Sequence, residues 1–252
     1  MKKKDMRIAD RLIGSSLITA ILIIWQILSC LDIVPKFLLP SPFDVIKAFI
    51  DDLPLIAHHT LYTLTESLIG LVIGAFSGFI LALFMDTFPI VKKLLYPLII
   101  ISQTVPTVAI APLLVLWLGY EMTPKITLIA MTTFFPISVS LMNGFSSVDI
   151  DSIQLLKAMG AGRIQIYKHV KLPFSVPHFF SGLKISVTYA IIGAVVAEWL
   201  GGFDGLGVYM TRARKSYAFD KMFAIIFFIS LLSLIAMAFL SLLEKKMVKW
   251  RD

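Results

Sequence analysis

The chain has 252 residues, of which 58% are hydrophobic and 15% charged, and its mean hydropathy is +0.88. A water-soluble domain of this length carries more surface charge, so the balance excludes an ordinary soluble protein and indicates a membrane protein. The single cysteine, Cys30, excludes an internal disulfide framework, and the net charge of +7 does not indicate nucleic-acid binding, because the basic residues stand at the ends of apolar segments.

Six apolar segments are long enough to cross a hydrocarbon core about 30 Å thick as helices. In chain order they are residues 12–31, 60–85, 96–118, 125–144, 179–200 and 222–243. We therefore predict an all-α membrane protein with six transmembrane helices, forming one domain over residues 1–252.

Positive charge predicts the direction of these helices, because loops rich in Lys and Arg stay in the cytoplasm. With a cytoplasmic N-terminus, fifteen basic residues fall inside and seven, among them Lys125, fall outside. Both termini are therefore predicted to be cytoplasmic, and residues 145–178 form the one sizeable cytoplasmic loop, between the fourth and fifth spans.

Small residues repeat every four positions along the second and fifth predicted spans. They are Gly70, Gly74, Gly78 and Ala82 on the second, and Gly182, Ser186, Ala190 and Ala194 on the fifth. Such faces let helix backbones approach closely. We favour packing within one subunit over a dimer interface.

Prolines interrupt the third and fourth predicted spans at Pro106, Pro112 and Pro136. The polar residues Ser102, Gln103 and Thr104 precede Pro106. Polar residues beside a proline-broken helix often line a solute pathway, because freed carbonyl groups need partners, and a simple kink is an equal alternative.

Glu66 is the only acidic residue predicted to lie well inside a span. Burying its charge costs about 2.5–3.5 kcal/mol, so the side chain should either pair with a polar group or take part in transport. Lys184 and Glu198 are expected to mark span ends, and His58 and His59 to lie at the membrane interface.

The 145–178 loop is predicted to be a helix–turn–helix. Asp151, with Gln154 three residues later, suits a helix N-cap, and Gly160-Ala161-Gly162 should stop this first helix. A second helix with apolar residues Ile164, Tyr167 and Val170 should end at Leu172-Pro173. Apolar residues without a core of their own favour a partner protein, and the alternative is a hairpin that folds back on its own subunit.

This loop resembles that of binding-protein-dependent ABC importer permeases. Gly160, nine intervening residues and Val170-Lys171-Leu172-Pro173 follow the family spacing, whereas Gln154-Leu155-Leu156 departs from the family's Glu-Ala-Ala. Leu39-Pro40-Ser41-Pro42, Ala197-Glu198-Trp199 and Gly205-Leu206-Gly207 look like the nitrate/sulfonate/taurine branch. Within that branch, Glu66 and Leu83-Phe84-Met85-Asp86 look more like permeases for thiamine-precursor pyrimidines.

The resemblance implies that the loop is a coupling helix that docks on a separate ABC ATPase subunit. The residues implied in ATPase coupling are Gln154, Leu155, Leu156, Ala158, Met159, Gly160, Ala161, Gly162, Leu172 and Pro173. Further partners are an extracytoplasmic solute-binding protein and a second permease subunit, with a homodimer favoured. The chain lacks a Gly-x4-Gly-Lys phosphate loop, so ATP and magnesium would bind the ATPase, and we expect no cofactor, metal or enzymatic activity here.

The predicted function is ATP-driven import of a small organic solute across the bacterial cytoplasmic membrane. The solute would be a thiamine-precursor pyrimidine, or a sulfonate-, taurine- or nitrate-like compound. The alternative is a secondary transporter driven by an ion gradient. That class favours several paired intramembrane acids, whereas this sequence offers Glu66 alone.

Overall fold

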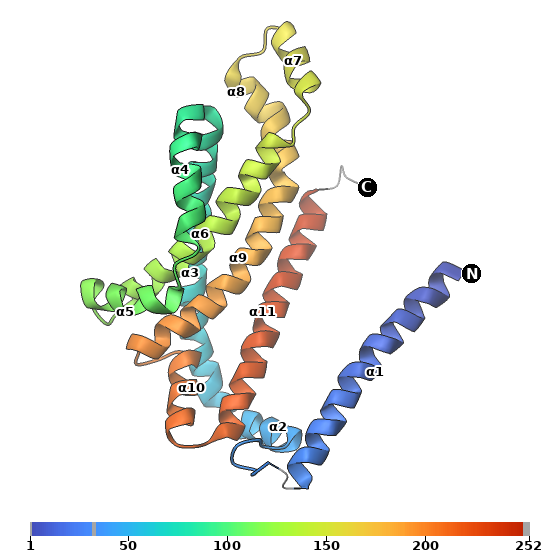
Figure 1. The fold of residues 1–252 in the computed structure, drawn as a ribbon, viewed down its shortest axis with the longest axis vertical. Helices are drawn as coiled ribbons and strands as arrows, with labels where there is room; N and C mark the ends of the chain where they lie inside the picture. Colours follow the sequence, from blue (N-terminus) through green and yellow to red (C-terminus); the bar gives the residue numbers. More distant parts are fainter. Residues whose placement is uncertain (1, 32–33, 249–252) are drawn as a thin grey trace. The chain divides into compact units, whose positions relative to one another are not determined.

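The computed structural model describes residues 2–31 and 34–248, with side chains from Ser16 onward, and every regular element of the described chain is a helix (Figure 1). Its elements are α1 (Lys2–Cys30), α2 (Pro42–Asp51), α3 (Leu53–Thr87), α4 (Pro89–Ser102), α5 (Thr107–Leu118), α6 (Met122–Ser146), α7 (Ile150–Ala158), α8 (Arg163–Ile166), a π-helical turn (Tyr167–Lys171), α9 (Leu172–Gly201), α10 (Leu206–Lys215) and α11 (Phe219–Met247). The all-α prediction is confirmed. Of the basic residues that predicted the orientation, Lys249 and Arg251 lie outside the described residues, as do the side chains of Lys2, Lys3, Lys4, Arg7 and Arg11.

Four described helices are long and apolar enough to cross a membrane: α3, α6, the continuous stretch Arg163–Gly201 and α11. Helices α4 and α5 are long and apolar enough to cross a membrane only when they are taken together as one broken span. The segment Ser16–Cys30 is a shorter apolar helix. The chain is therefore an all-helical, multi-pass membrane protein.

The third predicted span is not one helix. The structure places α4 and α5 at 99° to each other across residues 103–106, so the predicted interruption of this span at Pro106 is confirmed. Pro106 causes the break, because it has no N–H to donate and disfavours a helical residue before it. Pro112 and Pro136 lie inside α5 and α6, and neither ends its helix.

The chain divides into two compact units, and the first comprises residues 1–57 and 209–228. In this unit the Trp25 indole donates to the carbonyl oxygen of Pro40 at 3.0 Å and stacks on Phe227 with ring centres 5.6 Å apart. Asp52 accepts hydrogen bonds from Lys221 at 2.6 Å and from the Tyr209 hydroxyl at 2.5 Å. These contacts join α1, α2, α10 and the start of α11.

The ionisation of Asp52 and Tyr209 follows from that contact. Burial alone would raise the pKa of Asp52, but the hydrogen bonds from Lys221 and Tyr209 and the Lys221 charge outweigh it and lower the pKa. Burial and the hydrogen bond to the Asp52 carboxylate raise the pKa of Tyr209. Asp52 is therefore ionised and Tyr209 neutral at physiological pH.

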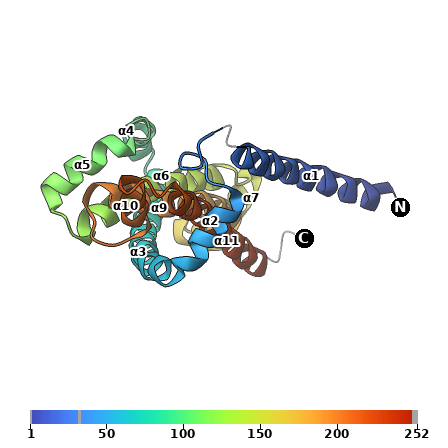
Figure 2. The ribbon, with the colours of Figure 1, turned by 90° about the horizontal axis from the view of Figure 1, so that it is seen from below.

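The second unit comprises residues 58–208 and 229–252, and α6 and α9 lie side by side at its centre (Figure 1, Figure 2). The glycines of α3 meet α6 directly, since a Cβ atom at Gly74 would lie 2.0 Å from Thr133 Oγ1 and one at Gly70 would lie 2.5 Å from Ile129 Cβ. On α9, a Cβ at Gly182 would lie 2.8 Å from the Pro136 carbonyl oxygen. The small-residue faces therefore pack within the subunit, as favoured from the sequence.

Candidate functional site

The first arm of the hairpin between α6 and α9 is α7, which begins after Asp149. The Asp149 carboxylate accepts from the backbone N–H groups of Asp151 at 3.2 Å and Ser152 at 3.3 Å. The prediction of Asp151 as the N-cap was wrong by two residues. Asp149 takes this place because its backbone is extended, whereas Asp151 already lies in the first helical turn.

The turn of the hairpin is built on Gly160, whose φ is +84°. The Gly160 N–H donates to the Lys157 carbonyl, and the Ala161 N–H donates to the Leu156 carbonyl, each at 2.9 Å. This pattern is a Schellman motif, which ends a helix through a left-handed residue that glycine adopts without strain. The predicted glycine stop is confirmed.

The second arm does not end at Leu172-Pro173 as predicted. The segment from Arg163 to Gly201 is continuous, and α8 passes through the π-helical turn Tyr167–Lys171 into α9. In that turn the Leu172 N–H bonds to the Tyr167 carbonyl, five residues back. Pro173 is the second residue of α9 and follows this wider turn directly.

The hairpin exposes its apolar residues. No residue of α7 is buried, and α7 and α8 extend beyond the ends of α6 and α9 that they connect (Figure 1). Met159 is 75% exposed and Ile164 83%. Of the predicted coupling residues, those exposed are Gln154, Leu155, Ala158, Met159, Gly160 and Gly162, and those half-buried are Leu156, Ala161, Leu172 and Pro173. The apolar residues around the turn thus face the surface, whereas Ile166 on α8 is buried in its own subunit.

A shielded ion pair ties the base of the hairpin to the end of α3. Asp86 Oδ2 accepts from Lys171 Nζ at 2.5 Å and from the Tyr167 hydroxyl. Thr87 Oγ1 lies 3.1 Å from the same hydroxyl. This contact could not be predicted from the sequence, because its partners are more than 80 residues apart.

A second polar cluster is buried among α3, α6 and α9. Lys125 Nζ lies 2.7 Å from Glu66 Oε1, with the two side chains 6% and 1% exposed. Glu198, which is 2% exposed, accepts from the Thr63 hydroxyl at 2.7 Å and from the Gly207 N–H at 2.6 Å. Lys125 lies in the first turn of α6 and Glu198 in the last turn of α9, so both stand at helix ends, and each is in addition buried with a partner that the sequence did not indicate. Glu66 is paired, which supports the structural alternative for this residue.

The loop after α9 closes over this cluster. The Gly205 N–H donates to His59 Nδ1 at 3.0 Å, and the Leu206 N–H donates to the Thr63 hydroxyl at 2.8 Å. Gly205 has φ +124°, and a Cβ atom there would lie 2.2 Å from Glu198 Cδ, so only glycine fits. His59 is buried against this loop, while its neighbour His58 has a side chain 52% exposed, and both lie near the start of α3.

The residues predicted to line a pathway do not come together. Ser102, Gln103 and Thr104 are exposed at the break between α4 and α5, whereas Glu66 is buried with Lys125. The hydroxyls of Ser102 and Thr104 donate to the carbonyls of Ile99 and Ile101 at 2.7 and 2.8 Å. They therefore satisfy carbonyl groups at the end of α4, while the Gln103 amide is exposed at the break.

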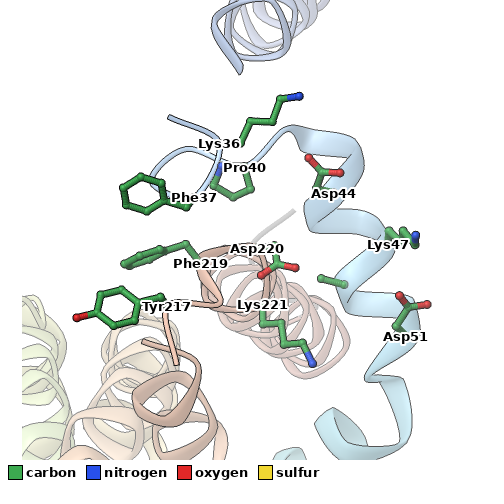
Figure 3. A pocket seen from close by; sticks show the side chains of 11 residues that line it. Lys36, Phe37, Pro40, Asp44, Lys47, Asp51, Tyr217, Phe219, Asp220 and Lys221 are labelled. Carbon is green, nitrogen blue, oxygen red and sulfur yellow. The ribbon is translucent and has the colours of Figure 1, made fainter. Parts of the chain in front are cut away.

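In the first unit, a pocket of about 470 Å³ lies between α2 and the residues that precede and begin α11 (Figure 3). Its lining combines lysines, aspartates and aromatic rings: Lys36, Phe37, Asp44, Lys47, Asp51, Tyr217, Phe219, Asp220 and Lys221. Tyr217 adopts φ +57°, which is uncommon for a residue other than glycine. Within the described residues, no group of three His, Cys, Asp or Glu side chains is placed to hold a metal ion.

Known proteins resemble this chain over most of its length. The family described as binding-protein-dependent transport system inner membrane component matches residues 68–249. The formylaminopyrimidine transport permease protein ThiX of Halalkalibacterium halodurans is 37% identical over 232 residues, which cover 92% of each chain. The putative aliphatic sulfonates transport permease protein SsuC of Bacillus subtilis is 30% identical over 242 residues, which cover 95% of this chain and 87% of that one.

Solved structures share the fold. A chain of an amino acid ABC transporter has a TM-score of 0.64 at 15% identity, covering 80% of this chain and 96% of that one. A chain of the inward-facing MetNI methionine ABC transporter has a TM-score of 0.55 at 18% identity, covering 74% and 89%. The argument against a secondary transporter counted Glu66 as the single intramembrane acid, and Glu198 is buried as well. The family and the relatives decide against that alternative. The chain belongs to the family of binding-protein-dependent ABC importer permeases and is the membrane-spanning component of such a transport system.

Proposed function

We propose that this permease imports a thiamine-precursor pyrimidine when a separate ATPase subunit acts on the α7–α8 hairpin. The solute is supported by the relative at 37% identity, whose name specifies formylaminopyrimidine, whereas the sulfonate relative is 30% identical. A sulfonate or taurine is the second candidate, because a taurine transport permease of Escherichia coli also matches, at 27% identity over 92% of this chain.

The hairpin is the observation that carries the proposal. Ile150, Leu155, Met159 and Ile164 are between 64% and 83% exposed, around a turn that a Schellman motif holds in one conformation. Burying one such side chain fully stabilises a complex by about 1.5–3 kcal/mol. An ordered apolar hairpin is thus suited to docking in a groove of another protein, and the ten coupling residues named from the sequence would form that contact.

The proposed topology has six crossings and two cytoplasmic termini. The crossings are α1, α3, the α4–α5 pair, α6, α9 and α11, with the hairpin and the end of α3 on the cytoplasmic side. The excess of basic residues in the cytoplasmic segments supports this orientation.

The solute pathway is proposed to pass the break between α4 and α5. Gln103 and Thr104 are exposed there in a single subunit, and Ser102 lies beside them. A second, identical permease subunit would face this break, and an extracytoplasmic binding protein would deliver the solute. ATP and magnesium would bind the ATPase subunits.

One reconstitution experiment tests solute and coupling together. Proteoliposomes holding the permease, its ATPase and its binding protein should take up radiolabelled formylaminopyrimidine only with ATP. Gly160→Glu should leave the permease in the membrane but remove most ATPase association and uptake, because a charged residue would be forced to φ +84° at the docking face. Gly119→Glu is the matched control, since Gly119 has a similar φ of +88° and open space around it but lies at the end of α5, away from the hairpin.

The outcomes separate the two halves of the proposal. Uptake of taurine but not of the pyrimidine by the wild-type complex would overturn the solute and leave the coupling standing. Full uptake by Gly160→Glu would overturn the coupling.

A further inference from the structure

We infer that Asp86, Tyr167 and Lys171 form a latch that makes the C-terminal end of α3 move with the α7–α8 hairpin. The inference rests on the proposed role of the hairpin and adds the residues that pass its movement to another helix. These three are positioning residues, which act through the helices that they join and not through contact with solute or ATP.

The latch is stronger than an ordinary surface ion pair. The side chains of Asp86 and Lys171 are 11% and 17% exposed, so water and salt screen their attraction weakly. One carboxylate oxygen, Asp86 Oδ2, accepts from both Lys171 Nζ and the Tyr167 hydroxyl. Lys171 Nζ also lies 5.0 Å from the centre of the Tyr167 ring. Charge-assisted hydrogen bonds of this kind have a defined geometry, whereas apolar helix contacts can slide.

The latch sits at the junction between hairpin and span. Tyr167 and Lys171 are the first and last residues of the π-helical turn that links α8 to α9. Phe145, near the end of α6, meets the Tyr167 ring edge-on at 6.1 Å. Movement of the hairpin therefore reaches α6 and α9 through the backbone, but α3 has no such connection. Single-turn π segments are rare and often mark functional sites.

Movement received at Asp86 would travel far along α3. This helix is continuous over 35 residues, and Glu66 lies twenty residues before Asp86 on it, which corresponds to about 30 Å at ~1.5 Å per residue. Glu66 and Thr63 join the buried cluster with Lys125 and Glu198. The latch thus links the ATPase side of the permease to a buried ion pair near the other end of the span.

A distance measurement tests the latch. In a Cys30→Ser background, spin labels at Lys157→Cys on α7 and Phe84→Cys on α3 report the separation of hairpin and helix in the reconstituted permease–ATPase complex. With the latch intact, adding ATP should leave the mean distance unchanged, because both labels move together. In Asp86→Asn and in Tyr167→Phe, ATP should shift the mean distance between the labels, or broaden its distribution, by roughly 2–5 Å, the scale of helix displacements in switching proteins.

Matched variants identify the cause. Lys184 and Glu244 form an ion pair of similar exposure that joins α9 to α11. Glu244→Gln removes this pair and should leave the distance between the two spin labels insensitive to ATP. The exchange Asp86→Lys with Lys171→Asp should restore that insensitivity. Co-purification of the ATPase subunit is measured for the wild-type permease and for every variant. A wild-type permease that does not co-purify with the ATPase would refute the proposed role of the hairpin, and this result is distinct from failure of the latch.

Two results would overturn the inference. An ATP-dependent shift in the intact protein would show that α3 does not follow the hairpin. An unchanged distance in Tyr167→Phe, which removes one hydroxyl and leaves the ion pair and the ring, together with an unchanged distance in Asp86→Asn, would show that the latch is not needed.

Discussion

Lys125 and Glu66 carry opposite charges 2.7 Å apart in a place that water barely reaches. Removing one of them would leave the other as a buried, unpaired charge, which is more costly than never having buried the pair. The two residues are 59 positions apart. In the sequence, Lys125 is an isolated charge at the end of a predicted span and Glu66 an isolated acid inside another. Their pairing could therefore not be predicted without knowing that α3 packs on α6.

Lys125→Met should therefore destabilise the permease by about 3–5 kcal/mol, as loss of one partner of a buried pair does. The double variant Glu66→Leu with Lys125→Met should recover most of that loss. Thermal unfolding of the purified protein in detergent measures both. Lys221→Met is the control, because Lys221 and its partner Asp52 are 39% and 19% exposed, and its effect should stay near 1 kcal/mol or less, about that of an exposed pair. Unchanged thermal stability of Lys125→Met would refute the structural role of the pair.

The ends of individual helices could be predicted from local sequence signals, except where the π-helical turn or packing between helices changed the outcome. The stop at Gly160 was predictable because the left-handed conformation there is a property of one residue and its turn. The predicted stop at Pro173 failed because the π-helical turn Tyr167–Lys171 lets α8 and α9 continue into each other. A four-residue glycine spacing indicated close packing of α3, and the contacts of Gly70 and Gly74 with α6 show it.

The break between α4 and α5 makes a prediction of its own. In a Cys30→Ser background, Gln103→Cys and Thr104→Cys should react with a polar thiol reagent at rates that change when ATP is added, because a pathway opens and closes to water. Leu116→Cys, on α5 and 78% exposed, is the control and should not respond to ATP. Inertness of positions 103 and 104 in every state would assign the break to a kink packed against protein.

At the scale of the molecule, composition and hydropathy were enough to predict an all-helical membrane protein, because the bilayer demands apolar helices of a set length. The family followed from one loop, whose glycine and proline spacing is specific. The break of the third segment was indicated by Pro106, whereas the latch at Asp86 and the buried cluster around Glu198 could not be predicted, since they depend on contacts between residues far apart in sequence.

The α7–α8 hairpin is, in the proposed function, the surface that the ATPase subunit contacts. A photoreactive residue placed at Met159, which is 75% exposed at the turn, should cross-link to the ATPase subunit in membranes. The same residue at Phe203, 80% exposed beyond the opposite end of α9, should not. A stable complex in which position 159 gives no cross-link and another surface does would contradict the account.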